Sequence, residues 1–399
     1  MMDDMIVPVE AAAFAHVDQV LRLAVTETAP ALQLVVQHQG KVRFAQAYGW
    51  LDPEHCYRPT TLATRFDLAS VTKLFVTAAF MRLCDQGLVT LDQSVAGVVA
   101  GFGGKRTIQP YEDPLQSGRL ISATTVPAGT VVDADAVTFR HLLTHSAGLP
   151  AWRPLFQQPD AAAARAMVRN TFFAAPIGTQ IIYSDIGLIL LGMAVESVHG
   201  QPLAEAVTDL VLAPLGLQQT TYLPTAAEQD MAEVCDPTTV APTEFCRWRN
   251  RRILAEVHDE NAARLGGVAG HAGLFSTAGD VARFGQLFLR DGKLPTGKPF
   301  LQPATVQEMR RQQIAFEGTR RGLGFLLWSA DPTASSHPFA TTAFGHTGFT
   351  GTSLWMDPAR DLVVALLTNE VYRGRTNRGI AALRVAVHQA VVDAVDGGA

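Results

Sequence analysis

Apolar and polar residues follow a helical period at the start of the chain and strand-like runs directly after it. Residues 9 to 28 are predicted to form an amphipathic helix, because apolar side chains recur there at helical spacing: Phe14, Val17, Leu21 and Ala24. Two β-rich runs, LQLVVQHQG and KVRFAQAYG, then meet at Gln39-Gly40. Two such runs around a turn pair predict a β-hairpin.

The middle of the chain, about residues 67 to 290, has the pattern of helices joined by long loops. Asp67 can cap a helix over residues 69 to 87, which Gly87 would end. Further helices are predicted at 138–144, 160–174, 184–199, 202–212 and 278–290. The connections at 97–130 and 218–270 are rich in glycine and proline, and loops this long inside a compact domain are usually functional.

Strand patterns return in the last hundred residues, and a helix over about 376–394 follows them. The predicted strands are 322–329, 342–348, 351–357 and 361–369. We expect the first and last strands to share one antiparallel sheet, with the terminal helices against it. The fold class is therefore α+β, in a single domain of residues 1–399 with a sheet region at about 9–66 and 291–399. The mainly helical region, about 67–290, is inserted between the two parts of the sheet.

Composition narrows the possible partners. The chain of 399 residues is 48% hydrophobic with a formal net charge of -5 and no basic stripe, so we expect no nucleic-acid partner. The longest apolar run, residues 186–195, is shorter than the ~18 residues that a membrane span needs. The acidic start, MMDDMIVPVE, does not resemble an export signal, and we expect a cytoplasmic protein. The four cysteines lack CxxC spacing and are expected to be reduced, although Cys235 and Cys246 could pair.

A serine and a lysine share one face of the apolar segment FDLASVTKLFVTAAF. Ser70 and Lys73 are three residues apart, and Ser70 lies in the first turn of the predicted helix. A serine hydroxyl needs a base before it becomes a good nucleophile, and a shielded lysine can act in that proton transfer. An exposed Ser-Lys pair on a helix surface is the alternative, since SxxK also occurs by chance.

Two further segments carry candidate chemistry. In IIYSDIGLILLG, Tyr183 could relay a proton and Asp185 could bind the lysine ammonium; the alternative is a core tyrosine beside a helix cap. In FGHTGFTGTSLWMD, the residues His346, Thr347 and Gly348 end a strand where a substrate can approach. The backbone amides of Ser70 and Phe349 could together hold an oxyanion.

These three segments resemble the motifs of the serine β-lactamase and penicillin-binding-protein superfamily, in its class C-like branch. SVTK, YSD and HTG stand in the order of that family's SxxK, YxN, and KTG or HxG motifs. The resemblance covers about residues 30 to 395. It implies Ser70 as the acylated nucleophile, Lys73 and Tyr183 as shared general base and acid, and Phe349 as the oxyanion-strand amide. By position it also implies that Trp152 and Trp328 line the substrate pocket.

Two departures from the family pattern affect the expected substrate. Asp185 replaces the usual asparagine and could hold Lys73 protonated, which would leave Tyr183 as the better base. His346 replaces the lysine that meets a ligand carboxylate, so efficient β-lactam hydrolysis is in doubt. Among acyl-enzyme activities, we place a carboxylesterase on small acyl esters first. A D-Ala-D-Ala carboxypeptidase-like amidase comes second, and a weak β-lactamase third.

The segment EVHDENAARLGGVAGHAG also resembles a subgroup of D-Ala-D-Ala carboxypeptidases, the penicillin-binding-protein 4B type. Members of that subgroup are generally exported, which conflicts with the cytoplasmic expectation. The residues His258, Asp259, Glu260 and His271 suggest a metal-dependent hydrolase as a rival, but their spacing matches no standard zinc pattern. We therefore expect no metal and no cofactor, and a small-molecule ester or amide as the partner. A non-catalytic ligand-binding protein on the same fold is the other rival.

Overall fold

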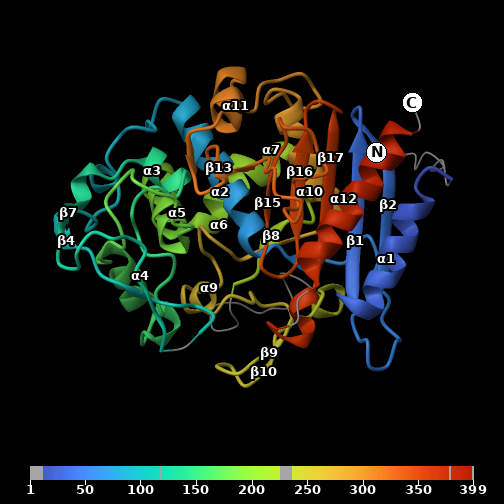
Figure 1. Ribbon diagram of the computed structural model, residues 1–399, viewed down its shortest axis with the longest axis horizontal. Helices are drawn as coiled ribbons and strands as arrows, with labels where there is room; N and C mark the ends of the chain where they lie inside the picture. Colours follow the sequence, from blue (N-terminus) through green and yellow to red (C-terminus); the bar gives the residue numbers. More distant parts are fainter. Residues whose placement is uncertain (1–11, 117, 225–235, 377–378, 398–399) are drawn as a thin grey trace.

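The computed structural model describes residues 12–116, 118–224, 236–376 and 379–397 (Figure 1). Its main element is an eight-stranded antiparallel sheet with the order β12-β13-β14-β15-β16-β17-β1-β2. The strands are β1 (Ala31–His38), β2 (Lys41–Gly49), β12 (Ile314–Phe316), β13 (Thr319–Arg321), β14 (Leu326–Leu327), β15 (Phe344–Thr347), β16 (Ser353–Asp357) and β17 (Leu362–Thr368).

The sheet joins the two ends of the chain, as the sequence predicts. Strand β1 pairs with β17 on one side and with β2 on the other. The β1–β2 hairpin turns at Gln39 and Gly40, whose φ angles of 52° and 71° are those that a two-residue hairpin turn needs. The chain leaves the sheet after β2 and returns at β12, with the helical region between them. The predicted α+β class is confirmed.

Helices cover both faces of the sheet. On one face lie α1 (Ala15–Glu27) and α12 (Ile380–Asp396), whose Leu21 and Val387 belong to one buried cluster with Leu34 and Trp355 of the sheet. On the other face, α10 (Ala278–Leu289) packs so closely that a Cβ at Gly285 would lie 2.8 Å from Val363. Figure 1 shows the terminal helices beside β1 and β2, with the helical region at the opposite end of the molecule.

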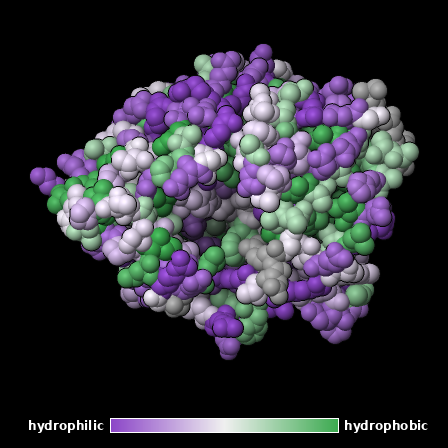
Figure 2. All heavy atoms as spheres, viewed as in Figure 1, coloured by the Kyte–Doolittle hydropathy of each residue, from purple (hydrophilic) through white to green (hydrophobic). Residues whose placement is uncertain are grey.

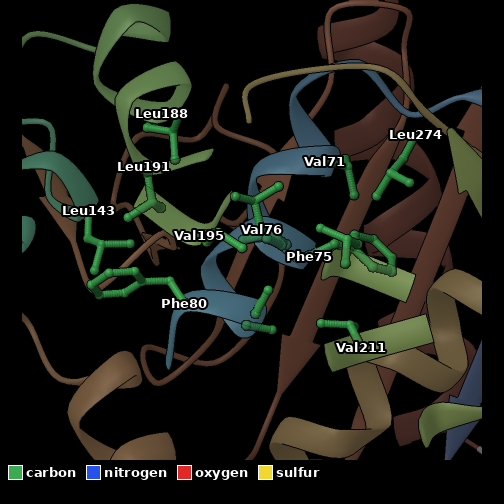
Figure 3. Close-up of a cluster of buried hydrophobic side chains, with 14 of the residues drawn as sticks. Val71, Phe75, Val76, Phe80, Leu143, Leu188, Leu191, Val195, Val211 and Leu274 are labelled. Atoms are coloured by element: carbon green, nitrogen blue, oxygen red, sulfur yellow. The ribbon is translucent and has the colours of Figure 1, made fainter. Parts of the chain in front are cut away.

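The helix that begins at Thr72, just after Ser70 in the sequence, is buried in the core. This helix, α2 (Thr72–Asp85), contacts α5 (Asp185–His199), and their apolar side chains interdigitate (Figure 3). Phe80 and Val76 of α2 lie against Leu191 and Val195 of α5 in this cluster. A helix that is apolar around its whole circumference is typical of a protein interior. The segment with Ser70 and Lys73 and the segment with Tyr183 and Asp185 are therefore fixed to one rigid pair of helices.

The remaining elements are short. The other helices are α3 (Phe139–Leu143), α4 (Ala161–Arg169), α6 (Leu203–Val207), α7 (Ala213–Leu215), α9 (Glu260–Arg264) and α11 (Pro303–Arg310). The small strands are β3 (Phe66–Asp67), β4 (Lys105–Thr107), β5 (Tyr111–Glu112), β6 (Leu120–Ile121), β7 (Val131–Asp133), β8 (Thr221–Tyr222), β9 (Phe245–Cys246), β10 (Arg251–Arg252) and β11 (Leu274–Ser276). Strands β3, β11 and β8 form a three-stranded sheet that contacts the nucleophile segment.

Two predicted elements are too long. The helix predicted at 160–174 ends at Arg169, because Phe173 instead forms a bridge with Ile108. The strand predicted at 322–329 pairs only at Leu326–Leu327, because Gly324, with φ of 76°, turns the chain just before it. The possible Cys235–Cys246 pair lies outside the described residues. Among those residues, no single helix is long and apolar enough to cross a membrane; the bent pair Asp185–His199 and Leu203–Leu215 passes by length and composition only.

Candidate active site

Ser70 lies in a strained turn. It is the middle residue of a 3-10 turn, Ala69–Val71, that leads into α2. The residue before it, Ala69, has a φ of 45°, which is unfavourable for a side chain with a Cβ. The buried carboxylate of Asp67 stabilises this turn by accepting a hydrogen bond from the Ala69 amide (2.8 Å). Strain of this kind is concentrated at functional sites, where the surrounding structure holds it in place.

The buried ammonium of Lys73 connects the serine to a carboxylate. Its Nζ atom lies 2.7 Å from Ser70 Oγ, 2.8 Å from Asp185 Oδ1 and 3.2 Å from the carbonyl oxygen of His271. Burial alone would lower the pKa of Lys73, but the neighbouring Asp185 and Tyr183 raise it above its ordinary value. Lys73 is 1% exposed. The lysine is therefore a charged hydrogen-bond donor to Ser70 rather than a free base.

Tyr183 and Asp185 flank the residue that caps α5. Ser184 Oγ accepts from the Gly187 amide (3.2 Å), so the cap predicted as an alternative is present together with the site. The Tyr183 ring lies beneath Lys73, with Nζ 4.8 Å from the ring centroid. His145 packs on the same ring, with centroids 4.6 Å apart, and its Nδ1 accepts from the Ser184 amide. Because Nδ1 is the acceptor, His145 is a neutral imidazole that orients the tyrosine segment.

The third motif comes from β15 and is uncharged. His346 Nδ1 donates to the carbonyl oxygen of Thr347 (2.7 Å), which leaves Nε2 as the ring's acceptor. Burial, together with the positive charge of Arg321, holds the pKa of His346 well below its usual range. Its ring centroid lies 5.8 Å from that of Tyr183. The motif that carries a lysine in the KTG form of the family pattern thus presents a neutral ring here.

The turn after β15 is fastened to the nucleophile segment. Thr350 Oγ1 donates to the carbonyl oxygen of Asp67 (2.7 Å), and Thr352 Oγ1 donates to that of Leu68 (2.9 Å). Gly348 lies so close that a Cβ there would be 2.6 Å from the Leu68 oxygen. Phe349 therefore lies within the turn that adjoins Ser70, as an oxyanion site shared by the two amides requires.

The segment 256–273 encloses the same site. The His258 amide donates to Asp67 Oδ2 (2.7 Å), and the His258 ring packs on Phe349 with centroids 5.6 Å apart. His271 Nε2 lies 3.0 Å from Asp259 Oδ1. These contacts hold the segment against Asp67, next to the nucleophile turn, and against Phe349.

A group of metal-ligand types does occur beside Lys73. Asp185, Asp259 and His271 each offer one ligand atom, and these atoms lie within 4.8 Å of one another. Of the four residues that suggested a metal site in the sequence, this group contains only Asp259 and His271. The other two have different partners, since His258 binds Glu244 and Glu260 binds Arg375. Since the Lys73 ammonium already contacts Asp185, a cation is present at this carboxylate without a metal.

The two tryptophans predicted to line the pocket lie in different parts of the structure. Trp152 lies next to Ala151, whose carbonyl oxygen accepts from the Asp185 amide (2.9 Å), and its ring neighbours Phe156. Trp328 packs instead with the cluster beneath α1 and α12, on the sheet face opposite to α2. The pocket role predicted for Trp328 is therefore wrong, because the strand register turns its side chain to the other face.

Arg321 is a site residue that the sequence did not reveal. It ends β13, is 4% exposed, and its guanidinium carbon lies 5.1 Å from the centroid of the Tyr183 ring. It directly precedes the predicted strand 322–329, but no local pattern marks the arginine itself. Figure 2 shows that this face of the molecule is hollowed between the helical region and the strands around β15.

A serine, lysine and tyrosine gathered where an antiparallel sheet meets a helical region define a class of protein, the serine β-lactamase and penicillin-binding-protein superfamily. The chain belongs to the Beta-lactamase family, whose sequence model matches residues 17–389. It is 31% identical to an N-acetylmuramyl-L-alanine amidase of Bacillus subtilis (strain 168), over 89% of this chain and 80% of the relative. It is 30% identical to an Escherichia coli (strain K12) protein named "Putative D-alanyl-D-alanine carboxypeptidase", over 86% and 78%.

Solved structures share the fold. The hydrolase EstCE1, described as having promiscuous acyltransferase activity, superposes with a TM-score of 0.69 at 22% identity, over 95% of this chain and 99% of EstCE1. A penicillin-binding-protein homologue from Caulobacter crescentus superposes with a TM-score of 0.70 at 20% identity, over 97% and 98%. The family and the two relatives above make the chain a serine hydrolase of this superfamily.

Proposed function

We propose that the protein is an amidase that forms an acyl-enzyme on Ser70 and cleaves an amide of the N-acetylmuramyl-L-alanine type. The observation that carries the reaction is the position of one ammonium, Lys73 Nζ, between Ser70 Oγ at 2.7 Å and Asp185 Oδ1 at 2.8 Å. The substrate class is supported by the amidase of Bacillus subtilis, to which most of the chain aligns.

The proposed reaction begins with proton transfer from Ser70 Oγ to the Tyr183 oxygen. Lys73, held protonated by Asp185, donates to the serine oxygen as this atom attacks the amide carbonyl. The tetrahedral oxyanion lies against the backbone amides of Ser70 and Phe349. Tyr183 then gives the proton to the leaving nitrogen, and the C–N bond breaks. Water attacks the resulting ester while the Tyr183 oxygen accepts its proton. The bond between the acyl carbon and Ser70 Oγ then breaks, and Tyr183 returns the proton to Ser70 Oγ.

The test is hydrolysis of N-acetylmuramyl-L-alanine by the wild type and by Ser70→Ala, with free L-alanine measured by mass spectrometry. We expect release by the wild type and a loss of at least ~10³-fold in the variant, since the nucleophile is removed. Equal release by both proteins would refute the serine mechanism. Absence of release by a wild type that still reacts with a fluorophosphonate would refute the substrate and keep the nucleophile.

A carboxylesterase on small acyl esters, the activity favoured by the sequence, is the second candidate. The neutral state of His346 favours it, because the third motif supplies no charge for a substrate carboxylate. Hydrolysis of p-nitrophenyl butyrate beside that of N-acetylmuramyl-L-alanine separates the two candidates. A much larger kcat/KM for the ester would move the assignment to a carboxylesterase.

A further inference from the structure

Arg321 is a buried cation without a matching anion. Its side chain is 4% exposed, and its Nε and Nη1 atoms have no hydrogen-bond partner among the residues that the structure describes. No acidic side chain in that part of the chain forms a salt bridge with it. An isolated charge in a protein interior destabilises the fold unless a partner compensates it. Such a residue therefore indicates that the site needs its charge.

The neighbour of this charge is Tyr183. The guanidinium carbon of Arg321 lies 5.1 Å from the tyrosine ring centroid, and Lys73 Nζ lies 4.8 Å from the same centroid. Burial lowers the pKa of Arg321 to about 10, with Tyr183 opposing the decrease, so the guanidinium stays charged at neutral pH. The phenol thus has a cation from α2 and another from β13 within reach of its ring.

The two cations differ in what compensates them. The charge of Lys73 is paired with Asp185 at 2.8 Å, so the field of this pair at Tyr183 is that of a dipole. Burial lowers the pKa of His145 and of His346 well below the usual range, and both rings are neutral. The charged and titratable groups that face Tyr183 from the packed elements are Lys73, Asp185, His145, His346 and Arg321. Among these, Arg321 is the uncompensated positive charge.

We propose that Arg321 is a positioning residue of the proton acceptor: it stabilises the negative charge on the Tyr183 oxygen and thereby keeps Tyr183 able to take the Ser70 proton. This inference rests on the serine mechanism proposed above, not on the substrate. It assigns to β13 the charge that the neutral third motif on β15 does not supply.

The experiment measures how fast a fluorophosphonate labels Ser70 between pH 5 and pH 10, by intact-protein mass spectrometry. The variants are Arg321→Met, which removes the charge, and Arg321→Lys, which keeps it. Arg320→Met is the matched control, since Arg320 is the preceding residue and binds Gln312 and Trp328 instead. Loss of a unit charge at this distance should move the acid limb of the Arg321→Met profile upward by ~1–2 pH units. We expect the acid limb of the labelling profile to lie at the same pH in Arg321→Lys and Arg320→Met as in the wild type.

The melting temperature separates this role from a structural one. Because Arg321 is unpaired, we expect Arg321→Met to melt at the same temperature as the wild type or higher, while it labels ~10–100-fold more slowly below pH 7. A uniform decrease at every pH, a lower melting temperature, or failure of Arg321→Lys to restore the limb would overturn the inference. An unchanged profile with a raised KM only for carboxylate-bearing substrates would also overturn it, in favour of substrate binding. Labelling of Ser70→Ala at the wild-type rate would instead refute the serine mechanism itself.

Discussion

Replacing Asp185 by asparagine removes the charge that keeps Lys73 protonated and leaves a nearly isosteric amide. The two charges are 2.8 Å apart, and the side chains are 1% and 22% exposed. With an effective dielectric constant of about 20, the Coulomb attraction at this distance is ~6 kcal/mol. Burial of the ammonium opposes part of it, and removal of one partner from a buried pair typically costs ~3–5 kcal/mol. We expect Asp185→Asn to lower the free energy of unfolding at pH 7 by that amount.

The pH dependence of this loss has a definite sign. In the wild type the pKa of Lys73 is raised above its ordinary value of 10.5, so the stabilisation is complete below pH 10.5 and fades as the pH rises through the folded-state pKa. In Asp185→Asn, burial dominates and the pKa of Lys73 falls. The unfolded state then binds more protons than the folded state at neutral pH, so the variant should become more stable from pH 7 to pH 10.

Urea unfolding of the wild type and Asp185→Asn at pH 7 and pH 9.5 measures both effects. The double variant Lys73→Met/Asp185→Asn is the control, because it removes both charges and should recover most of the lost stability. A single variant as stable as the wild type at pH 7, with no gain at pH 9.5, would refute the charge pairing. A double variant no more stable than the single one would show that packing, not charge, causes the loss.

Three other predictions follow from the site. His346→Lys should raise the ratio of penicillin turnover to neutral-ester turnover by ~10-fold, since it places a cation in the third motif; an unchanged ratio in steady-state assays argues against this. Trp328→Ala should lower the free energy of unfolding by ~1–3 kcal/mol in urea titrations yet change kcat/KM less than about twofold, because Trp328 packs on the far sheet face. Dialysis against a chelator should leave fluorophosphonate labelling of Ser70 unchanged, whereas loss of labelling that zinc restores would assign a metal to Asp185, Asp259 and His271.

The sequence predicted those parts of the fold that depend on local pattern. The β1–β2 hairpin follows from a turn pair between two β-rich runs, and α5 follows from its cap and its apolar length. The sequence also predicted that the first and last strands share one antiparallel sheet, but the direct pairing of β1 with β17 was established only by the structure. The helix α11 and the short strands β12 and β13 were missed, because their patterns are too brief to show a period.

The residues of the candidate site likewise fall into those that a local pattern predicted and those that depend on tertiary packing. Ser70, Lys73, Tyr183 and His346 were predicted as site residues because each lies in a short motif of fixed spacing, and the structure brings them close together. Arg321 was missed because only tertiary packing brings β13 to the tyrosine. The error at Trp328 has a related cause: the sequence gives a position along the strand, whereas the sheet face depends on register, which a shift of one residue inverts.

The pairing of β1 with β17 also bears on how the chain reaches its native state. Leu32 of β1 pairs with Thr368 of β17 in that ladder. Strand β1 therefore cannot form this pairing until the ribosome has also synthesised β17. Contacts this distant in sequence slow folding, since a long loop must close before they form. During translation the apolar edge of β1 would be open to pairing with other chains. We therefore expect slow, chaperone-assisted folding in vivo, and truncation before β17 to yield aggregates rather than a smaller folded protein.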